Sequence, residues 1–189
     1  LGLEKGNYIL LSAHREENID TEKNFISLFL AINKMAEKYD MPILYSCHPR
    51  SRNRLAASGF QLDPRVIQHE PLGFHDYNCL QMNAFAVVSD SGTLPEESSF
   101  FTSVGHPFPA ICIRTSTERP EAIDKGDFII AGIDEKSLLQ AVDTAVELCQ
   151  NGQHGIPVPD YSDENVSTKV VKIVQSYVGI VNKMVWRKF

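Results

Sequence analysis

Three absences narrow the class of protein. The 189-residue sequence has no apolar run near the ~20 residues that a membrane-spanning helix needs. Its 18 Lys and Arg against 24 Asp and Glu give a net charge of −6, which argues against a generally basic nucleic-acid-binding surface. No C-x-x-C pair occurs, so we expect buried thiols in a reducing cytoplasm rather than disulfides or zinc ligands. The four cysteines are Cys47, Cys79, Cys112 and Cys149.

The sequence also lacks the short motifs of several enzyme classes. It has no G-x-G-x-x-G, no G-x-x-x-x-G-K-[ST] and no H-E-x-x-H, so dinucleotide redox, P-loop and zinc-hydrolase chemistry lose their main support. No G-x-S-x-G elbow surrounds Ser91, which argues against a hydrolase nucleophile. The six histidines are scattered along the chain. We therefore predict neither a metal ion nor an organic cofactor.

The composition, 43% apolar and 22% charged, is ordinary for a soluble globular chain. Short apolar runs alternate with segments of helical periodicity. Strands are expected at 8–11, 43–45, 66–67, 85–88, 110–113 and 128–130. Helices are expected at 20–39, 51–58, 76–83, from 93 onward, around 138–149 and at 165–186. This order predicts an α/β fold with a doubly wound, mostly parallel sheet.

Two helix starts carry specific capping expectations. Asp20 stands where the N-cap of the first long helix is expected. Thr93 and Glu96 have the spacing of a capping box. The chain begins directly before its first predicted strand, and we expect it to be one domain, residues 1–189, of a longer protein. A Gly- and Pro-rich stretch, 152–159, separates the final helix from this body.

The polar residues that follow the predicted strands indicate where a ligand binds. In an open parallel sheet, ligands bind beyond the carboxyl ends of the strands. Four such ends carry His, Arg, Ser or Gly, which favours an anionic ligand. They are Ser12-Ala13-His14-Arg15-Glu16-Glu17, Cys47-His48-Pro49-Arg50, Ser89-Asp90-Ser91-Gly92-Thr93 and Arg114 to Glu121.

Ser91-Gly92-Thr93 connects a strand to a helix through small residues, an arrangement that points backbone N–H groups and the positive end of the helix dipole at a phosphate. A simple capped turn is the alternative. His14 has the chemistry to bond a phosphate oxygen or move a proton, and Arg15 to clamp phosphate. Alternatively, His14 bonds loop carbonyls and Arg15 pairs with a following glutamate.

Further charged residues each allow two interpretations. Arg119 lies in a predicted loop between two acids and suits either an internal ion pair or a phosphate contact. Glu97 either interacts favourably with the helix dipole or accepts from ribose hydroxyls. Arg50, Arg52 and Arg54 are expected to form a solvated helix face rather than a nucleic-acid site, because no aromatics are interleaved with them.

As a set, these strings resemble the C-terminal half of the non-hydrolysing UDP-N-acetylglucosamine 2-epimerases, which implies a Rossmann-like half of a glycosyltransferase-B architecture. The strings are Ser12-Ala13-His14-Arg15-Glu16, His48-Pro49, Ser89-Asp90-Ser91-Gly92-Thr93 with Glu96-Glu97, and Thr117-Glu118-Arg119-Pro120-Glu121. The longer strings His14-Arg15-Glu16-Glu17-Asn18 and Val185-Trp186-Arg187-Lys188 resemble a capsule and O-antigen subgroup that converts UDP-2-acetamido-2,6-dideoxy-L-talose to UDP-N-acetyl-L-fucosamine. Two positions differ from the wider family, since Ala13 and Thr93 stand where it usually has glycine.

The resemblance implies a role for each candidate residue. His14 would lie beside the diphosphate and the sugar and act in catalysis, Ser91, Gly92 and Thr93 would form the diphosphate loop, and Glu97 would bind the ribose. Arg15 and Arg119 would bind phosphate, and the backbone from Leu72 to Phe74 would hold the uracil. The family reaction eliminates UDP and adds it back after C2 is protonated on the other face.

The resemblance also implies partners. The acids that move the C2 proton would lie in an N-terminal domain that these 189 residues lack, so we expect the chain alone to be inactive. We expect a UDP-sugar substrate, that N-terminal domain, and a homodimer of the full-length protein as partners, with no nucleic acid or membrane. The alternative functions are the donor-binding half of a UDP-sugar glycosyltransferase and a nucleotide-sensing module.

Overall fold

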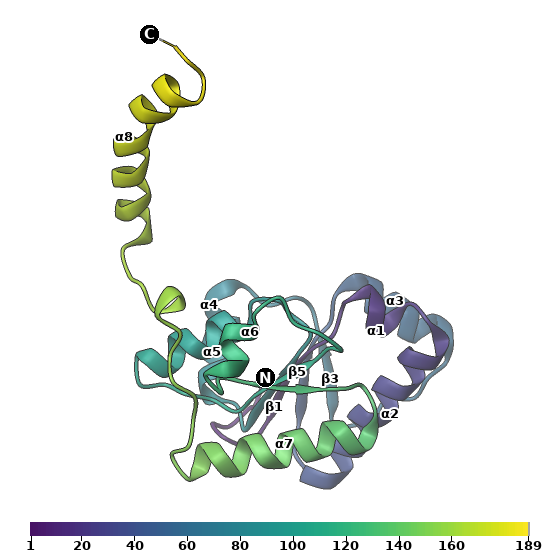
Figure 1. Cartoon of the computed structure of the whole chain (residues 1–189). Coiled ribbons are helices and arrows are strands. Elements are labelled where there is room, and N and C mark those ends of the chain that lie inside the picture. The colour runs from purple at the N-terminus through teal and green to yellow at the C-terminus, as the bar shows by residue number, and fades with distance from the viewer. Residues whose placement is uncertain (189) are drawn as a thin grey trace.

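The computed structural model describes residues 1–188 and contains one six-stranded parallel sheet (Figure 1). The strands lie in the order β3-β2-β1-β4-β5-β6. Their bounds are β1 (Ile9–Ser12), β2 (Ile43–Ser46), β3 (Val66–His69), β4 (Ala86–Ser89), β5 (Ala110–Ile113) and β6 (Ile129–Ala131). The chain adds strands outward in one direction from β1 and in the other from β4. The predicted doubly wound sheet is therefore confirmed, with its topological switch between β1 and β4.

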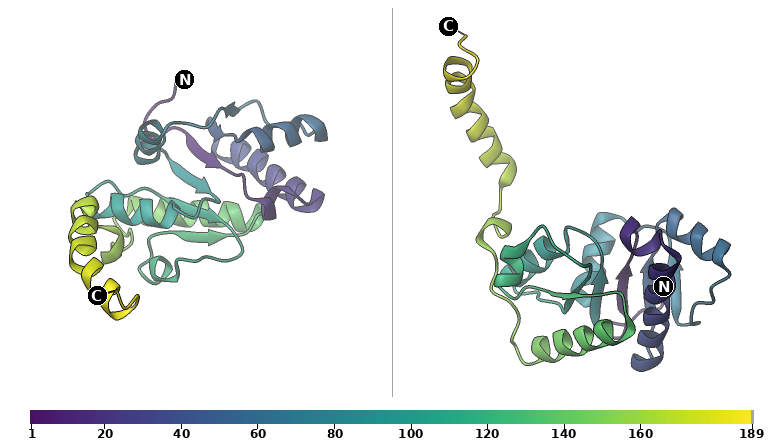
Figure 2. Two further views of the ribbon diagram at one scale, coloured as in Figure 1. Left: turned by 90° about the horizontal axis from the view of Figure 1, so that it is seen from above. Right: turned by 45° about the vertical axis from the view of Figure 1, so that its right-hand side comes forward.

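Helices cover both faces of this sheet (Figure 2). They are α1 (Glu16–Ile19), α2 (Glu22–Tyr39), α3 (Pro49–Ser58), α4 (Phe74–Asn83), α5 (Leu94–Ser103), α6 (Pro120–Asp124), α7 (Glu135–Gln150) and α8 (Val166–Met184), with a short 3₁₀ turn η1 (Pro159–Tyr161) before the last. None of the helices among residues 1–188 is long and apolar enough to cross a membrane.

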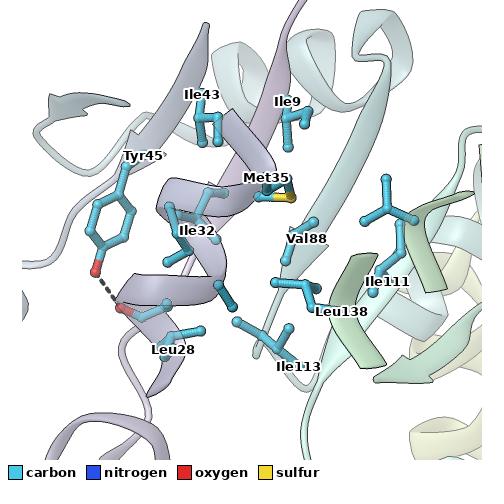
Figure 3. Packing of buried hydrophobic residues seen from close by; sticks show 14 of the residues in the cluster. Ile9, Leu28, Ile32, Met35, Ile43, Tyr45, Val88, Ile111, Ile113 and Leu138 are labelled. Carbon is cyan, nitrogen blue, oxygen red and sulfur yellow. Dashed lines mark hydrogen bonds between the residues drawn. The ribbon is translucent and has the colours of Figure 1, made fainter. Parts of the chain in front are cut away.

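Two apolar clusters lie on opposite faces of the sheet because successive strand side chains point to opposite sides. Ile9 and Leu11 face the cluster formed with α2 and α7, which Figure 3 shows from close by. Leu10 faces the cluster that includes Leu94 of α5 and Ala122 of α6. Both faces are thus covered, which explains why the strands read as continuous apolar runs.

The ends of several elements differ from the sequence-based expectations. Asp20 does not cap α2, since it is the C-cap that follows the separate turn α1. The N-cap is Thr21, whose hydroxyl accepts from the backbone N–H of Asn24 at 3.2 Å. Thr93 forms no side-chain cap to the α5 backbone, so the predicted capping box with Glu96 is wrong. The region before β6 contains the helical turn α6, where a loop was expected.

The cysteine expectation is also only partly right. Cys47 and Cys112 are buried and Cys149 is partly buried, but Cys79 is exposed. Cys79 lines an open cleft, together with Met82 of the same helix.

The segment 151–158 forms a strap that carries the chain from α7 to η1. The Ile156 N–H donates to the Lys125 carbonyl at 2.9 Å, and the Val158 N–H donates to Oγ of the buried Ser99 at 2.7 Å. Gly155 passes so close to Asp127 that an added Cβ would lie 2.4 Å from Oδ1 of that residue. Only glycine therefore fits at this position.

Beyond η1 the chain leaves the body, and α8 projects away from it (Figures 1 and 2). The structure shows no buried residue in α8. Its predicted apolar stripe is therefore largely exposed, with Val181 partly buried. The exposed large apolar residues of this C-terminal segment are Val166, Val170, Val171, Ile173, Val174, Tyr177, Val178, Ile180, Met184, Val185 and Trp186.

The strap generates a stability prediction. Asp127 is only 6% exposed, and neither carboxylate oxygen has a hydrogen-bond partner among residues 1–188. Burial raises the pKa of Asp127, and the nearby Ser99 hydroxyl offsets only part of this. The folded state thus favours the protonated acid, so this group's contribution to stability is lost as pH rises above the ordinary aspartate pKa of 3.8.

We therefore expect Asp127→Asn to raise the free energy of unfolding at pH 7 by about 1–3 kcal/mol, because the neutral amide removes a buried charge that no hydrogen bond compensates. The gain should shrink toward pH 4, where the wild-type acid takes up its proton. Urea unfolding at both pH values measures this. Asp124→Asn, which changes an exposed acid three residues away, is the control and should have no such effect. An equal gain at both pH values would contradict the assignment.

Candidate functional site

The candidate site lies at the carboxyl edge of the sheet, at the switch between β1 and β4. Ser12 and Ser89 are paired in register at the ends of these strands. The residues that follow, His14 and Asp90, therefore emerge side by side. This is the position at which doubly wound sheets bind ligands.

The carboxylate of Asp90 joins the loops of this edge. Its side chain is fully buried, and Oδ2 accepts from the backbone N–H groups of His14 at 2.9 Å and Arg15 at 2.8 Å. A third donor, the Asn18 amide, lies 3.1 Å from the same oxygen. Asn18 also donates to the Ile113 carbonyl at 2.9 Å, which links the loop to the end of β5. One buried anion therefore fixes the loop after β1. Asp90 belongs to one of the predicted strand-end motifs, but no role was predicted for it.

His14 is close to the other oxygen of this carboxylate. Its Nδ1 lies 3.2 Å from Oδ1 of Asp90 and 3.5 Å from the Ser12 hydroxyl, and its side chain is 44% exposed. The alternative in which His14 bonds loop carbonyls is therefore not what the structure shows. The His14 ring therefore lies against Asp90 on its Nδ1 side, while nearly half of the side chain is exposed to solvent.

Arg15 lies across the small-residue loop. Its Nε donates to the Asp90 carbonyl at 2.8 Å, and its Nη2 lies 3.3 Å from the point that a Cβ on Gly92 would occupy. The predicted alternative pairing with a following glutamate is wrong, because Glu16 pairs with Arg50 at 2.7 Å and Glu17 lies 3.5 Å from Arg114. The Arg15 guanidinium is thus held at the start of α5.

The loop from Ser91 to Thr93 is organised by its hydroxyls. The Ser91 N–H donates to the Ser89 hydroxyl at 3.0 Å, and the Ser91 and Thr93 hydroxyls lie 2.9 Å apart. The backbone N–H of Gly92 has no hydrogen-bond partner in the described part of the chain. A free N–H, the start of a ten-residue helix and an arginine therefore converge, and each of these features favours an anion.

Glu97 lies one turn into α5 and is held at both oxygens. Oε1 accepts from the Thr93 hydroxyl at 2.7 Å, and Oε2 accepts from the amide of Gln81 at 2.6 Å. Thr93, which departs from the glycine usual in the resembled family, thus bonds to a neighbouring candidate residue. The contacts fix the position of the Glu97 carboxylate, and its ribose role stays a prediction.

Arg119 forms an ion pair, with a partner that the sequence did not indicate. Its Nε and Nη2 both lie 2.7 Å from Oε1 of Glu96 on α5. The flanking acids are engaged elsewhere: Glu118 accepts two bonds of 2.7 Å from the buried Arg114, and Glu121 accepts from Tyr161. Hydrogen bonding from Arg114 lowers the pKa of Glu118 to about 2. Of the two predicted alternatives, the structure shows the internal ion pair, which holds Arg119 beside α5, and the phosphate contact stays a prediction.

Phe74 begins α4 and is 76% exposed, as a large apolar residue in a binding site often is. It lines an open cleft of about 440 Å³ between α4 and α5. Glu97 lies at the same cleft, together with aromatic side chains that the sequence analysis did not assign: Phe100, Phe101 and Tyr161. The signal for Phe100 and Phe101 in the sequence was the aromatic character of the segment after residue 99, whereas Tyr161 had no such signal.

The arginines of α3 form the expected solvated face. Arg50 bonds to Glu16 and to Asp20 at 2.7–2.9 Å, and Arg52 lies 3.5 Å from Glu70. Arg54 stacks over the ring of Phe25, with 5.1 Å between its guanidinium carbon and the ring centroid. Each of the three arginines therefore has a partner within the chain.

Comparison with known proteins agrees with this architecture. The family model that matches residues 2–175 is described as UDP-N-acetylglucosamine 2-epimerase. A UDP-N-acetylglucosamine 2-epimerase of Methanococcus maripaludis is 31% identical over 172 residues, which cover 88% of this chain and 44% of that protein.

Two solved structures extend the comparison. The UDP-N-acetylglucosamine 2-epimerase of Rickettsia bellii is 35% identical with a TM-score of 0.84, over 98% of this chain and 48% of that chain. The UDP-GlcNAc 2-epimerase of Methanocaldococcus jannaschii, in complex with UDP-GlcNAc and UDP, is 26% identical with a TM-score of 0.77, over 89% and 45% of the two chains. The present chain thus spans less than half the length of these relatives.

The contacts of Asn18 generate a stability prediction. Asn18→Ala removes two buried hydrogen bonds, one of them to a carboxylate, and leaves Oδ2 of Asp90 with one donor fewer. We expect a loss of about 2–4 kcal/mol in the free energy of unfolding, measured in urea. Asn24→Ala is the matched control: its exposed amide makes one bond, to the Glu17 carbonyl at 2.7 Å, and its loss should change stability by at most about 1 kcal/mol. Equal losses would contradict a special role for Asn18.

Proposed function

The chain belongs to the UDP-N-acetylglucosamine 2-epimerase family, and from this premise we propose that it is the C-terminal, UDP-sugar-binding half of a sugar-nucleotide C2 epimerase. In this proposal the whole enzyme eliminates UDP from the sugar and adds it back after C2 has been protonated on the other face. The enzyme acts in the cytoplasm of a bacterium, on a precursor of a surface polysaccharide.

The observation that carries the proposal is the convergence at the switch point. Arg15, the free N–H of Gly92 and the N-terminus of α5 meet at one place, and Asp90 holds the loop that carries Arg15. Two adjacent phosphates bring negative charge that suits all three. The relative from M. jannaschii, whose structure was solved with UDP-GlcNAc and UDP, supports a UDP-sugar as the ligand.

The cleft beside this point suits the nucleoside. Phe74 presents an exposed ring to a base, and the Glu97 carboxylate accepts hydrogen bonds from ribose hydroxyls one turn below the phosphate loop. We assign the ribose to Glu97 and the uracil to Phe74 and the backbone that precedes it. The base then lies over α4 while the sugar points toward His14.

This half of the enzyme stabilises the leaving group. As the C1–O bond breaks, its electron pair passes to the phosphate oxygen, and negative charge grows on the UDP. Donors that are already fixed in place stabilise this charge without reorganising, and such stabilisation is usually the largest single contribution to an enzyme's rate enhancement. Arg15, Gly92 and Arg119 supply these donors, and His14 lies beside the breaking bond.

The companion half carries the groups that move the C2 proton and packs on α8. The chain's length relative to the solved structures, less than half, leaves room for a second domain. The side chains of α8 form an extensive exposed apolar surface. Soluble proteins rarely expose large contiguous apolar patches to water, so we expect a partner surface to cover this one. We propose that this partner is the N-terminal domain of the same enzyme.

The sugar is proposed more narrowly from sequence. The strings His14-Arg15-Glu16-Glu17-Asn18 and Val185-Trp186-Arg187-Lys188 resemble the enzymes that form UDP-N-acetyl-L-fucosamine for capsule and O-antigen synthesis. The structure gives three of these residues structural partners: Glu16 pairs with Arg50, Glu17 approaches Arg114, and Asn18 bonds to Asp90. We propose UDP-2-acetamido-2,6-dideoxy-L-talose as the substrate.

Titration calorimetry with UDP tests the binding assignment. We expect Arg119→Ala to weaken UDP binding by about 10- to 100-fold, the effect of one hydrogen bond to a charged group. Arg65→Ala is the matched control: this arginine also forms ion pairs, with Asp63 and Asp40, but it lies at the opposite edge of the sheet, directly before β3. Unchanged UDP affinity in Arg119→Ala, or an equal loss of affinity in both variants, would contradict the proposed role of Arg119 in UDP binding.

Isotope exchange tests the division of labour. The chain of 189 residues, incubated with the UDP-sugar in D₂O, should incorporate no deuterium at C2, because the proton-transferring acids belong to the companion half. A full-length relative run in parallel is the positive control. Mass spectrometry of the recovered sugar nucleotide measures the exchange, and deuterium at C2 with this chain alone would refute the division.

A further inference from the structure

The two carboxylate oxygens of Asp90 have different surroundings. Oδ2 accepts three N–H donors, from the backbone of His14 and Arg15 and from Asn18. Oδ1 is buried and has no hydrogen-bond partner among residues 1–188, and it lies 3.2 Å from Nδ1 of His14. A buried charged oxygen without a donor is costly, and the His14 ring carries the group that can supply one.

Three groups from neighbouring elements face the His14 ring. They are the Asp90 carboxylate, the Ser12 hydroxyl 3.5 Å from Nδ1, and the His48 ring, whose centroid is 6.5 Å away. An ionised carboxylate only accepts hydrogen bonds, whereas a hydroxyl donates or accepts. The carboxylate oxygen 3.2 Å from Nδ1 is therefore an obligate acceptor, and its proximity favours a proton on Nδ1.

We propose that Asp90 is a positioning residue that holds neutral His14 in the tautomer with its proton on Nδ1. Nε2, on the far side of the ring from Asp90, is then an unprotonated acceptor for a ligand. In a neutral imidazole, the hydrogen bond that one ring nitrogen makes decides which of the two nitrogens carries the proton. The tautomer follows from this chain alone, whereas its use by a sugar nucleotide rests on the proposed function.

The consequence concerns what His14 offers to the bound molecule. With Nδ1 protonated, the neutral ring accepts a hydrogen bond or a proton at Nε2 from a hydroxyl or amide of the sugar. The opposite tautomer presents an N–H there and offers a hydrogen bond to a phosphate oxygen instead. Asp90 thereby selects between two chemistries of the same side chain without touching the ligand.

Nitrogen-15 NMR of the imidazoles tests this in the ligand-free chain, at a pH where His14 is neutral. The His14 signals are assigned by their loss in His14→Gln. In the wild type we expect a protonated-type shift at Nδ1 and an unprotonated-type shift at Nε2. Asp90→Asn keeps an amide oxygen for the three N–H donors but turns an NH₂ group toward Nδ1, so the two shifts should exchange.

Ser12→Ala is the matched control, because it removes the competing hydroxyl and should leave the wild-type pattern. A proton on Nε2 in the wild type overturns the proposal even if Asp90→Asn fails to fold. An unchanged pattern in a folded Asp90→Asn protein, or an exchange in Ser12→Ala, also overturns it. UDP binding enters none of these measurements, so a failed functional assignment and a failed tautomer assignment remain distinguishable.

Discussion

The buried carboxylate of Asp90 is the interaction on which the arrangement of the site depends. Its chain position, directly after β4, places a negative charge between the two central strands, where water is excluded and hydrogen bonds to a charge are strong. Three N–H groups satisfy one oxygen, and two of them belong to the loop after β1. That loop carries His14 and Arg15, so their placement follows from one anion at the switch point.

The sheet was predictable because its strands are buried on both faces and read as apolar runs. The long helices were predictable from their periodicity. The turns α1 and α6 were missed because four or five residues contain hardly more than one helical period. The α2 cap was placed one residue early, since Asp20 and Thr21 are both good caps and only the end of α1 decides between them. The capping box failed because the Thr93 hydroxyl bonds to the Glu97 side chain instead of the backbone.

The sequence predicted those parts of the candidate site that lie directly after the strands. Parallel strands bring their carboxyl ends to one edge, so His14, Arg15 and the Ser91 loop could be grouped from sequence alone. The partners of these residues could not, because they lie far away in sequence: Arg119 pairs with Glu96, and Tyr161 reaches the cleft beside Phe74. Asp90 was overlooked because an aspartate in a polar loop is normally solvated, and only the fold shows it fully buried.

The strap is bonded to the body of the domain, whereas α8 extends away from it (Figure 1). The strap bonds to α5 and to the turn before β6, at Ser99 and Lys125, and α8 then begins after Asn165, which has a left-handed backbone (φ 57°). Among the described residues, none of α8 is buried against the sheet and its helices. A surface that packs on this helix therefore displaces no residue of the core, because no α8 residue belongs to either apolar cluster.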